Sequence, residues 1–214
     1  MKLSKATAIY IIALICLSFA NIANSALISN GSLTGNVGIG TTPSGWTINS
    51  FSPDTLSATS QPFGIDVNPG DSPDGGTWVG LARNSNVFES FGQDVSGFTI
   101  GQTYSISWYN TNTACCSGAY SAAAEILFDL DGATVFAGST ITADGMWYQE
   151  TYNFVATALT HTLDFRLDVG TEAYLGIDGI ALSLVSNVPA PTSSVFAIFM
   201  ICSLLVLKAK KWTK

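Results

Sequence analysis

Residues 161–169 have the sequence HTLDFRLDV, in which apolar and polar side chains alternate. A period of two places Leu163, Phe165 and Leu167 on one face of an extended chain and their polar neighbours on the other. The pattern therefore predicts a strand with one buried and one solvated face. Residues 103–109, TYSISWY, repeat this alternation and predict a second strand of the same kind.

Strand-like stretches recur on both sides of these two, and no amphipathic helical period longer than two turns occurs between residues 26 and 186. The pair Asp131-Gly132 separates two of them and is a hairpin signal. We therefore predict one all-β domain over residues 26–186, built as an antiparallel β-sandwich. The further predicted strands are residues 63–67, 77–82, 88–95, 125–130, 146–155 and 174–185.

Charge is distributed unevenly along the 214 residues, which hold 8 Lys and Arg against 15 Asp and Glu. All of the acidic residues lie between Asp54 and Asp178, whereas the predicted domain contains only two basic residues, Arg83 and Arg166. Because such a surface repels a phosphate backbone, we exclude nucleic acid as a partner.

Residues 1–25 are predicted to be a secretory signal peptide. Two lysines precede an apolar run over residues 6–20, and small residues occupy positions 23 and 25. This order is typical of a leader that uses the Sec translocon and is cut by signal peptidase, here before Ala26. Lipidation of Cys16 is not expected, because the bulky Ile15 stands where a lipobox needs a small residue.

The other end of the chain has three parts: a proline-containing linker at 187–194, an apolar run at 195–207 and a lysine-rich tail at 208–214. Thirteen helical residues cover about 20 Å, so the run is a short membrane span. The lysines favour a cytoplasmic terminus with the domain on the outside. An ordinary tail anchor is one interpretation of this arrangement.

The same three-part order resembles the PEP-CTERM sorting tail of Gram-negative bacteria, with Val188, Pro189, Ala190 and Pro191 as the motif. Ala190 stands where that family usually has Glu, and Lys replaces the commoner Arg in the tail. The resemblance implies transient anchoring in the inner membrane and an exosortase-type membrane protease as partner. The final location would then be the cell surface or an extracellular biofilm matrix that contains exopolysaccharide.

Five phrases of the domain, in order, resemble the galactose-binding-like jelly roll of bacterial carbohydrate-binding modules. The resemblance implies a jelly-roll sandwich and leaves the ligand open, because this fold hosts many functions. The phrases are NGSL (30–33), GW (45–46), SPDGGTW (72–78), VSGFTIGQTY (95–104) and GIDGI (176–180).

Enzymatic activity is not expected, because no nucleophile with a nearby base can be identified. His161 is the only histidine and begins a predicted strand, so we expect it at a strand edge on the surface.

Asp178 shares the alternation of Ile180 and Leu182, so its carboxylate is expected to point inward and to need a partner. The jelly-roll resemblance implies one structural Ca²⁺ there, with further oxygens from Asp74. Thr34 departs from this pattern, because related modules often have a Glu ligand at its position. Hydrogen bonds from backbone amides to Asp178 are the alternative.

Cys115 and Cys116 are the only cysteines of the predicted domain, and export exposes both to an oxidising compartment. They can form a vicinal disulfide, remain free thiols or bond to another chain. The vicinal disulfide is favoured and would stiffen the loop from residue 110 to residue 120.

Aromatic side chains are the usual platforms for sugar rings. Trp46 and Trp108 are expected in the core, which leaves Tyr109, Tyr120, Trp78 and Trp147 as candidate ligand-binding residues, with ordinary packing as the alternative for each.

The sequence as a whole predicts an exported, exosortase-sorted surface or matrix protein with a structural or adhesive role in exopolysaccharide. The alternative is a dedicated glycan-binding module with a defined sugar groove, and a glycan-active enzyme is a remote third possibility.

Overall fold

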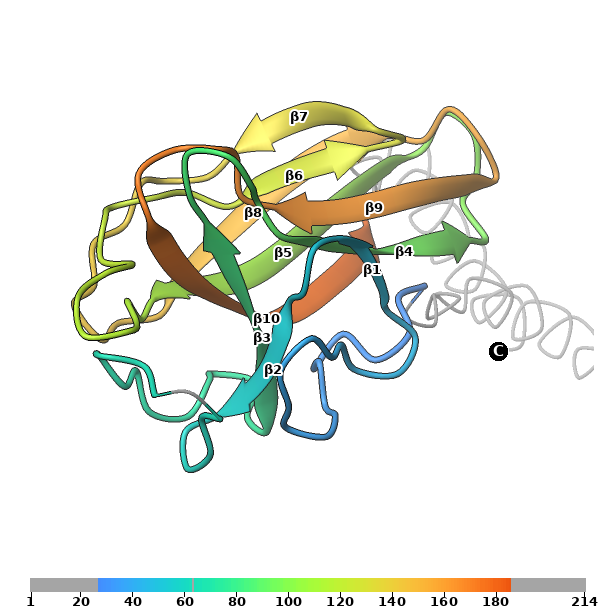
Figure 1. Ribbon diagram of the computed structural model, residues 1–214. Helices are drawn as coiled ribbons and strands as arrows, with labels where there is room; N and C mark the ends of the chain where they lie inside the picture. The colour runs from blue at the N-terminus through green and yellow to red at the C-terminus, as the bar shows by residue number, and fades with distance from the viewer. Residues whose placement is uncertain (1–26, 63, 186–214) are drawn as a thin grey trace, which may run out of the picture. The chain divides into compact units, whose positions relative to one another are not determined.

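The computed structural model describes residues 27–62 and 64–185, in which ten strands form two five-stranded antiparallel sheets (Figure 1). This all-β jelly-roll sandwich confirms the predicted fold class. Sheet A contains, in spatial order, β2 (Asp54–Ser57), β3 (Thr77–Arg83), β10 (Ala173–Leu184), β5 (Thr103–Asn112) and β8 (Tyr148–Val155). Sheet B contains β1 (Thr47–Ser50), β4 (Ser90–Ser96), β9 (Thr160–Arg166), β6 (Leu127–Leu130) and β7 (Ala133–Ala137).

Seven of the eight predicted strands correspond to β3, β4, β5, β6, β8, β9 and β10. The predicted hairpin joins β6 to β7, and Asp131 and Gly132 both have the positive φ that such a tight turn requires. The strand predicted at 63–67 is wrong, since residues 64–67 contribute only an isolated bridge between Ile65 and Cys115. The four-residue strands β1 and β2 and the five-residue strand β7 were not predicted.

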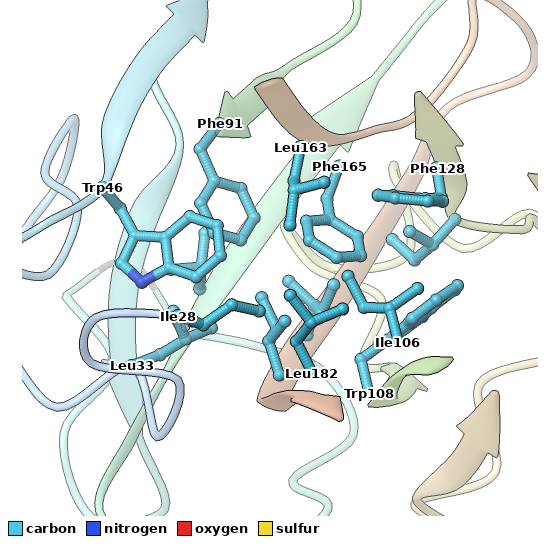
Figure 2. Close-up of a cluster of buried hydrophobic side chains, with 14 of the residues drawn as sticks. Ile28, Leu33, Trp46, Phe91, Ile106, Trp108, Phe128, Leu163, Phe165 and Leu182 are labelled. Carbon is cyan, nitrogen blue, oxygen red and sulfur yellow. The ribbon is translucent and has the colours of Figure 1, made fainter. Parts of the chain in front are cut away.

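The main hydrophobic core lies between the two sheets and is rich in aromatic rings (Figure 2). Trp108 of β5 packs edge-on against Phe165 of β9, with ring centroids 5.2 Å apart. Trp46 lies 5.1 Å from Phe91 of β4 and closes one side of the core. The prediction that Trp46 and Trp108 are core residues is confirmed.

A second apolar cluster covers the outer face of sheet A. Trp78 and Tyr174 alternate along their strands with core-facing residues, so they point to the opposite side of the sheet. Leu56 and Cys115 complete the buried part of this cluster. Strands β2 and β3 and the first half of β10 are therefore buried on both faces of sheet A.

Strand β10 changes face at a β-bulge. Asp178 pairs with Tyr109, but Ala181, three residues further on, pairs with Ser107, which is only two residues away on the partner strand. Gly179 takes up the extra residue with a φ of 60°. Asp178 therefore lies on the outer face of sheet A with Tyr109. The prediction that strict alternation turns Asp178 into the main core was wrong.

His161 is also placed differently from its prediction, because it is 1% exposed and not a surface residue. Its Nε2 accepts hydrogen bonds from the backbone amides of Thr157 and Ala158, both at 3.2 Å. Nδ1 therefore carries the proton and donates to Asp131 at 2.6 Å. These bonds explain the burial and occupy both ring nitrogens, so His161 has no free nitrogen to act as a catalytic base.

The predicted signal peptide, sorting motif and apolar run lie outside the residues that the structure describes. Within the described ranges 27–62 and 64–185, no helix has the length and apolar character needed to cross a bilayer.

Two buried carboxylates lie close together at the β2 end of sheet A. Asp54 accepts a hydrogen bond from the Tyr174 hydroxyl at 2.9 Å, and Glu89 accepts one from the Ala82 amide at 2.7 Å. Burial, partly offset by the Ala82 bond and reinforced by the charge of Asp54, raises the pKa of Glu89 to about 7.

We expect the ionisation of Glu89 to reduce stability as the pH rises from about 5 to about 8. The folded-state pKa of about 7 lies above the ordinary value of 4.5, so the free energy of unfolding falls as the pH passes through the folded-state value. The shift corresponds to roughly 3 kcal/mol. Glu89→Gln should remove this part of the pH dependence in urea unfolding, whereas the exposed Glu172→Gln should not. Equal pH slopes for wild type and Glu89→Gln would contradict the assignment.

Candidate functional site

The bulge in β10 brings together three of the predicted site residues. A Cβ on Gly179 would lie 2.9 Å from a ring carbon of Tyr109 and 3.2 Å from the Cβ of Asp74. Asp178, the next residue, is the strand partner of Tyr109. Asp74, Tyr109 and Asp178, which come from three separate segments of the sequence, are therefore neighbours on the outer face of sheet A.

A groove of about 280 Å³ lies beside this cluster. One wall is the segment around Gly31 and Ser32, and the other is β10 from Gly179 to Leu182, with Asp74 at the rim. The Gly31 carbonyl accepts a hydrogen bond from the Ile180 amide at 2.8 Å, and a side chain on Gly31 would collide with the Ile180 carbonyl. Gly31 thus allows the first described segment to lie against the bulge.

Asp178 is fully buried, and neither of its carboxylate oxygens makes a hydrogen bond with the described residues. Burial raises its pKa to about 7, although the nearby Ser72 hydroxyl and Gly179 amide act in the opposite direction. The negative charge of Asp74 contributes to the rise. An uncompensated charge is costly in this position, so Asp178 needs a proton, a cation or another polar partner.

The donor chemistry here is compatible with Ca²⁺, which prefers carboxylate and carbonyl oxygens. Asp178 would provide an otherwise unpartnered buried carboxylate, and Asp74 a second, exposed one. Backbone carbonyls would have to complete the coordination, because in the part of the chain that the structure describes no three His, Cys, Asp or Glu side chains form a metal-holding group. Binding of one structural Ca²⁺ at Asp178 and Asp74 stays a prediction.

If Ca²⁺ binds at Asp178, removing it should lower the melting temperature. An ion that binds only the folded state stabilises it by about 3 kcal/mol at a hundredfold excess over its Kd, which corresponds to several degrees. Asp178→Asn should abolish the response to chelator, whereas Asp168→Asn, which changes an exposed carboxylate beyond sheet B strand β9, should keep it. Calorimetry with and without chelator measures this effect. A wild-type melting curve that chelator leaves unchanged would show that no Ca²⁺ binds at Asp178.

The other three candidate aromatic residues lie in the second cluster. Trp78 is fully buried, so it is an ordinary packing residue and not a ligand-binding one. Its ring meets Trp147 edge-on at 5.6 Å, and Trp147 and Tyr120 are partly buried against the same cluster. Tyr109 is half-buried beside the groove. It is therefore the candidate ring placed best for contact with a ligand.

The structure joins Cys115 and Cys116 in a vicinal disulfide within the loop that follows β5. Cys115 packs into the second cluster. The carboxylate of Asp66 accepts hydrogen bonds from the amides of Ser117 and Gly118 at 3.1 and 2.7 Å, which holds the loop from the other side. The sequence did not reveal this role of Asp66, because the two segments are about fifty residues apart.

Comparison with known proteins finds no matching family model and no matching curated protein. Solved structures do match. An arabinose-bound α-L-arabinofuranosidase shares the fold with a TM-score of 0.51 and 13% identity, over 78% of this chain and 27% of that one. The CBM22-1 xylan-binding domain from Paenibacillus barcinonensis has a TM-score of 0.49 and 18% identity, over 78% of this chain and 99% of that domain.

The enzymatically active domain of tailspike protein 4 from bacteriophage CBA120 also matches, with a TM-score of 0.49 and 16% identity over 75% of this chain. This chain spans only about a fifth of the tailspike chain and about a quarter of the arabinofuranosidase chain. At such identities the likeness concerns the fold alone, which is a jelly-roll β-sandwich.

Proposed function

We propose that this chain is an exported surface protein whose jelly-roll domain binds a glycan in the groove beside the β10 bulge. The observation that carries the proposal is the groove itself, which is lined in part by Ser32, Asp74 and Gly179. The half-buried ring of Tyr109 lies against Gly179, at one end of the groove.

The chemistry of this groove suits a sugar ring. The face of Tyr109 can pack against the C–H side of a pyranose, while the Ser32 hydroxyl and Asp74 carboxylate can bond to hydroxyl groups. Because the domain is acidic, a neutral or cationic glycan fits better than an anionic one. The fold neighbour solved with arabinose suggests neutral sugars as the first ligands to test.

We propose further that the chain is anchored in the inner membrane and then released or re-anchored by an exosortase-type protease. Support comes from the order of the linker, the apolar run and the lysine-rich tail in the sequence. A structural or adhesive role in exopolysaccharide is compatible with this sorting but requires no groove, whereas the geometry favours a glycan-binding module.

Binding of the purified protein to a glycan array is expected to show signals that depend on the groove. Tyr109→Ala and Asp74→Ala should each lower affinity about tenfold or more, because each removes a direct contact of roughly 1.4 kcal/mol or more. Tyr148→Ala removes an exposed tyrosine that does not line the groove and should leave binding unchanged. Absence of binding to any glycan would favour the matrix role instead.

Sorting predicts that the mature surface protein ends near residues 189–192 and lacks the lysine-rich tail. Intact mass of the protein isolated from the cell surface measures this directly. A mature species that retains Lys214 in a host with the protease would show a plain membrane anchor.

A further inference from the structure

Three large apolar side chains are exposed together at one end of the sandwich. Ile100 is 59% exposed in the loop before β5, and Val155 and Leu159 are 53% and 64% exposed where β8 connects to β9. The two loops lie together at the right of Figure 1, one green and one orange. We call these three residues the apolar tip.

The apolar tip is held firmly by backbone hydrogen bonds between the two loops. The amides of Gly97 and Phe98 both donate to the Leu159 carbonyl, at 3.0 and 3.2 Å. Gly101 donates to the Ala156 carbonyl at 2.8 Å, and Ala156 donates to Gln102 at 2.9 Å. His161 fixes the second loop from below through its two amide bonds. The exposed side chains are therefore presented by ordered backbone.

Charge is absent from the segments that carry the apolar tip, since residues 95–103 and 155–160 contain no Asp, Glu, Lys or Arg. The acidic groups nearest along the strands are already engaged. Asp131 bonds to His161 and to the Thr162 amide, and Asp94 accepts a hydrogen bond from the Thr162 hydroxyl. An uncharged apolar patch on an otherwise acidic domain is suited to contact with another apolar phase.

The path of the chain indicates which apolar surroundings the tip can reach. Leu184, the last residue of β10, pairs with Tyr104 at the start of β5, so the domain ends beside the loop that carries Ile100. Ten residues, 185–194, then separate Leu184 from the predicted apolar run at 195–207. Ten extended residues reach at most about 35 Å. The apolar tip is thus within reach of any bilayer that holds the run.

We propose that the apolar tip rests on the lipid surface of the membrane in which the chain is anchored. The contact would insert Ile100, Val155 and Leu159 at the boundary of headgroups and acyl chains, as interfacial apolar side chains do. It would keep the segment with the sorting motif close to the membrane, where a membrane protease works. The inference rests on the membrane anchoring in the proposed function and is independent of glycan binding.

The test uses the full chain reconstituted in phosphatidylcholine vesicles that contain a photoactivatable phosphatidylcholine. After illumination, mass spectrometry maps the lipid adducts. Adducts are expected on peptides with residues 97–102 and 155–160 as well as on the apolar run. The double change Ile100→Ser and Leu159→Ser should lower labelling of these loops at least about fivefold, with labelling of the run unchanged.

Phe51 provides the matched control, because it is 60% exposed but follows β1 at the opposite end of β4 from the tip. Its peptide should remain unlabelled, and Phe51→Ser should change nothing. Labelling of the run without labelling of the tip loops, or equal labelling at Phe51, would overturn this inference alone. Absence of labelling on the run itself would overturn the anchoring and this inference with it.

Discussion

The β-bulge at Gly179 is the constraint on which the arrangement of this molecule depends. Strand β10 lies at the centre of sheet A between β3 and β5, so any change in its register affects both neighbours. The extra residue lets the strand bury Ile180 in the main core while turning Asp178 toward Tyr109. Only a residue without a Cβ fits, because Tyr109 and Asp74 crowd that position. The groove, the buried carboxylate and the candidate ring are all placed by this one residue.

Strand β9 and most of strand β5 could be predicted because they have one dry and one wet face, which produces alternation in the sequence. Prediction failed where that condition is absent. Strand β10 is buried on both faces over its first six residues, so the sequence there does not indicate which side chains point into the main core. Strands β1 and β2 are only four residues long, too short for a periodic pattern to be distinguished from a loop.

The types of residue in the candidate site could be predicted from the sequence, but their complete arrangement in space could not. The jelly-roll resemblance paired Asp74 with Asp178 as ligands of one Ca²⁺, whereas Tyr109 was selected separately as an aromatic ring. The structure shows that Tyr109 is a neighbour of both. Ser32 and Gly31 had no chemical signal of their own, since their role depends on a contact with β10 almost 150 residues later. His161 was misplaced for a similar reason, because its partner Asp131 lies in a distant hairpin.

The vicinal disulfide has unequal surroundings, because Cys115 is 3% exposed in the second cluster whereas Cys116 is exposed to solvent. An attacking thiolate therefore reaches the exposed Cys116 more readily than the buried Cys115, and the sulfur of Cys115 would then be the leaving group. Exchange is slow when the leaving thiolate is disfavoured, and apolar surroundings disfavour a thiolate. Burial of Cys115 in the cluster with Leu56 and Trp78 is therefore expected to slow reduction of the bond. The apolar cluster on the outer face of sheet A thus also affects the reactivity of the disulfide loop that packs against it.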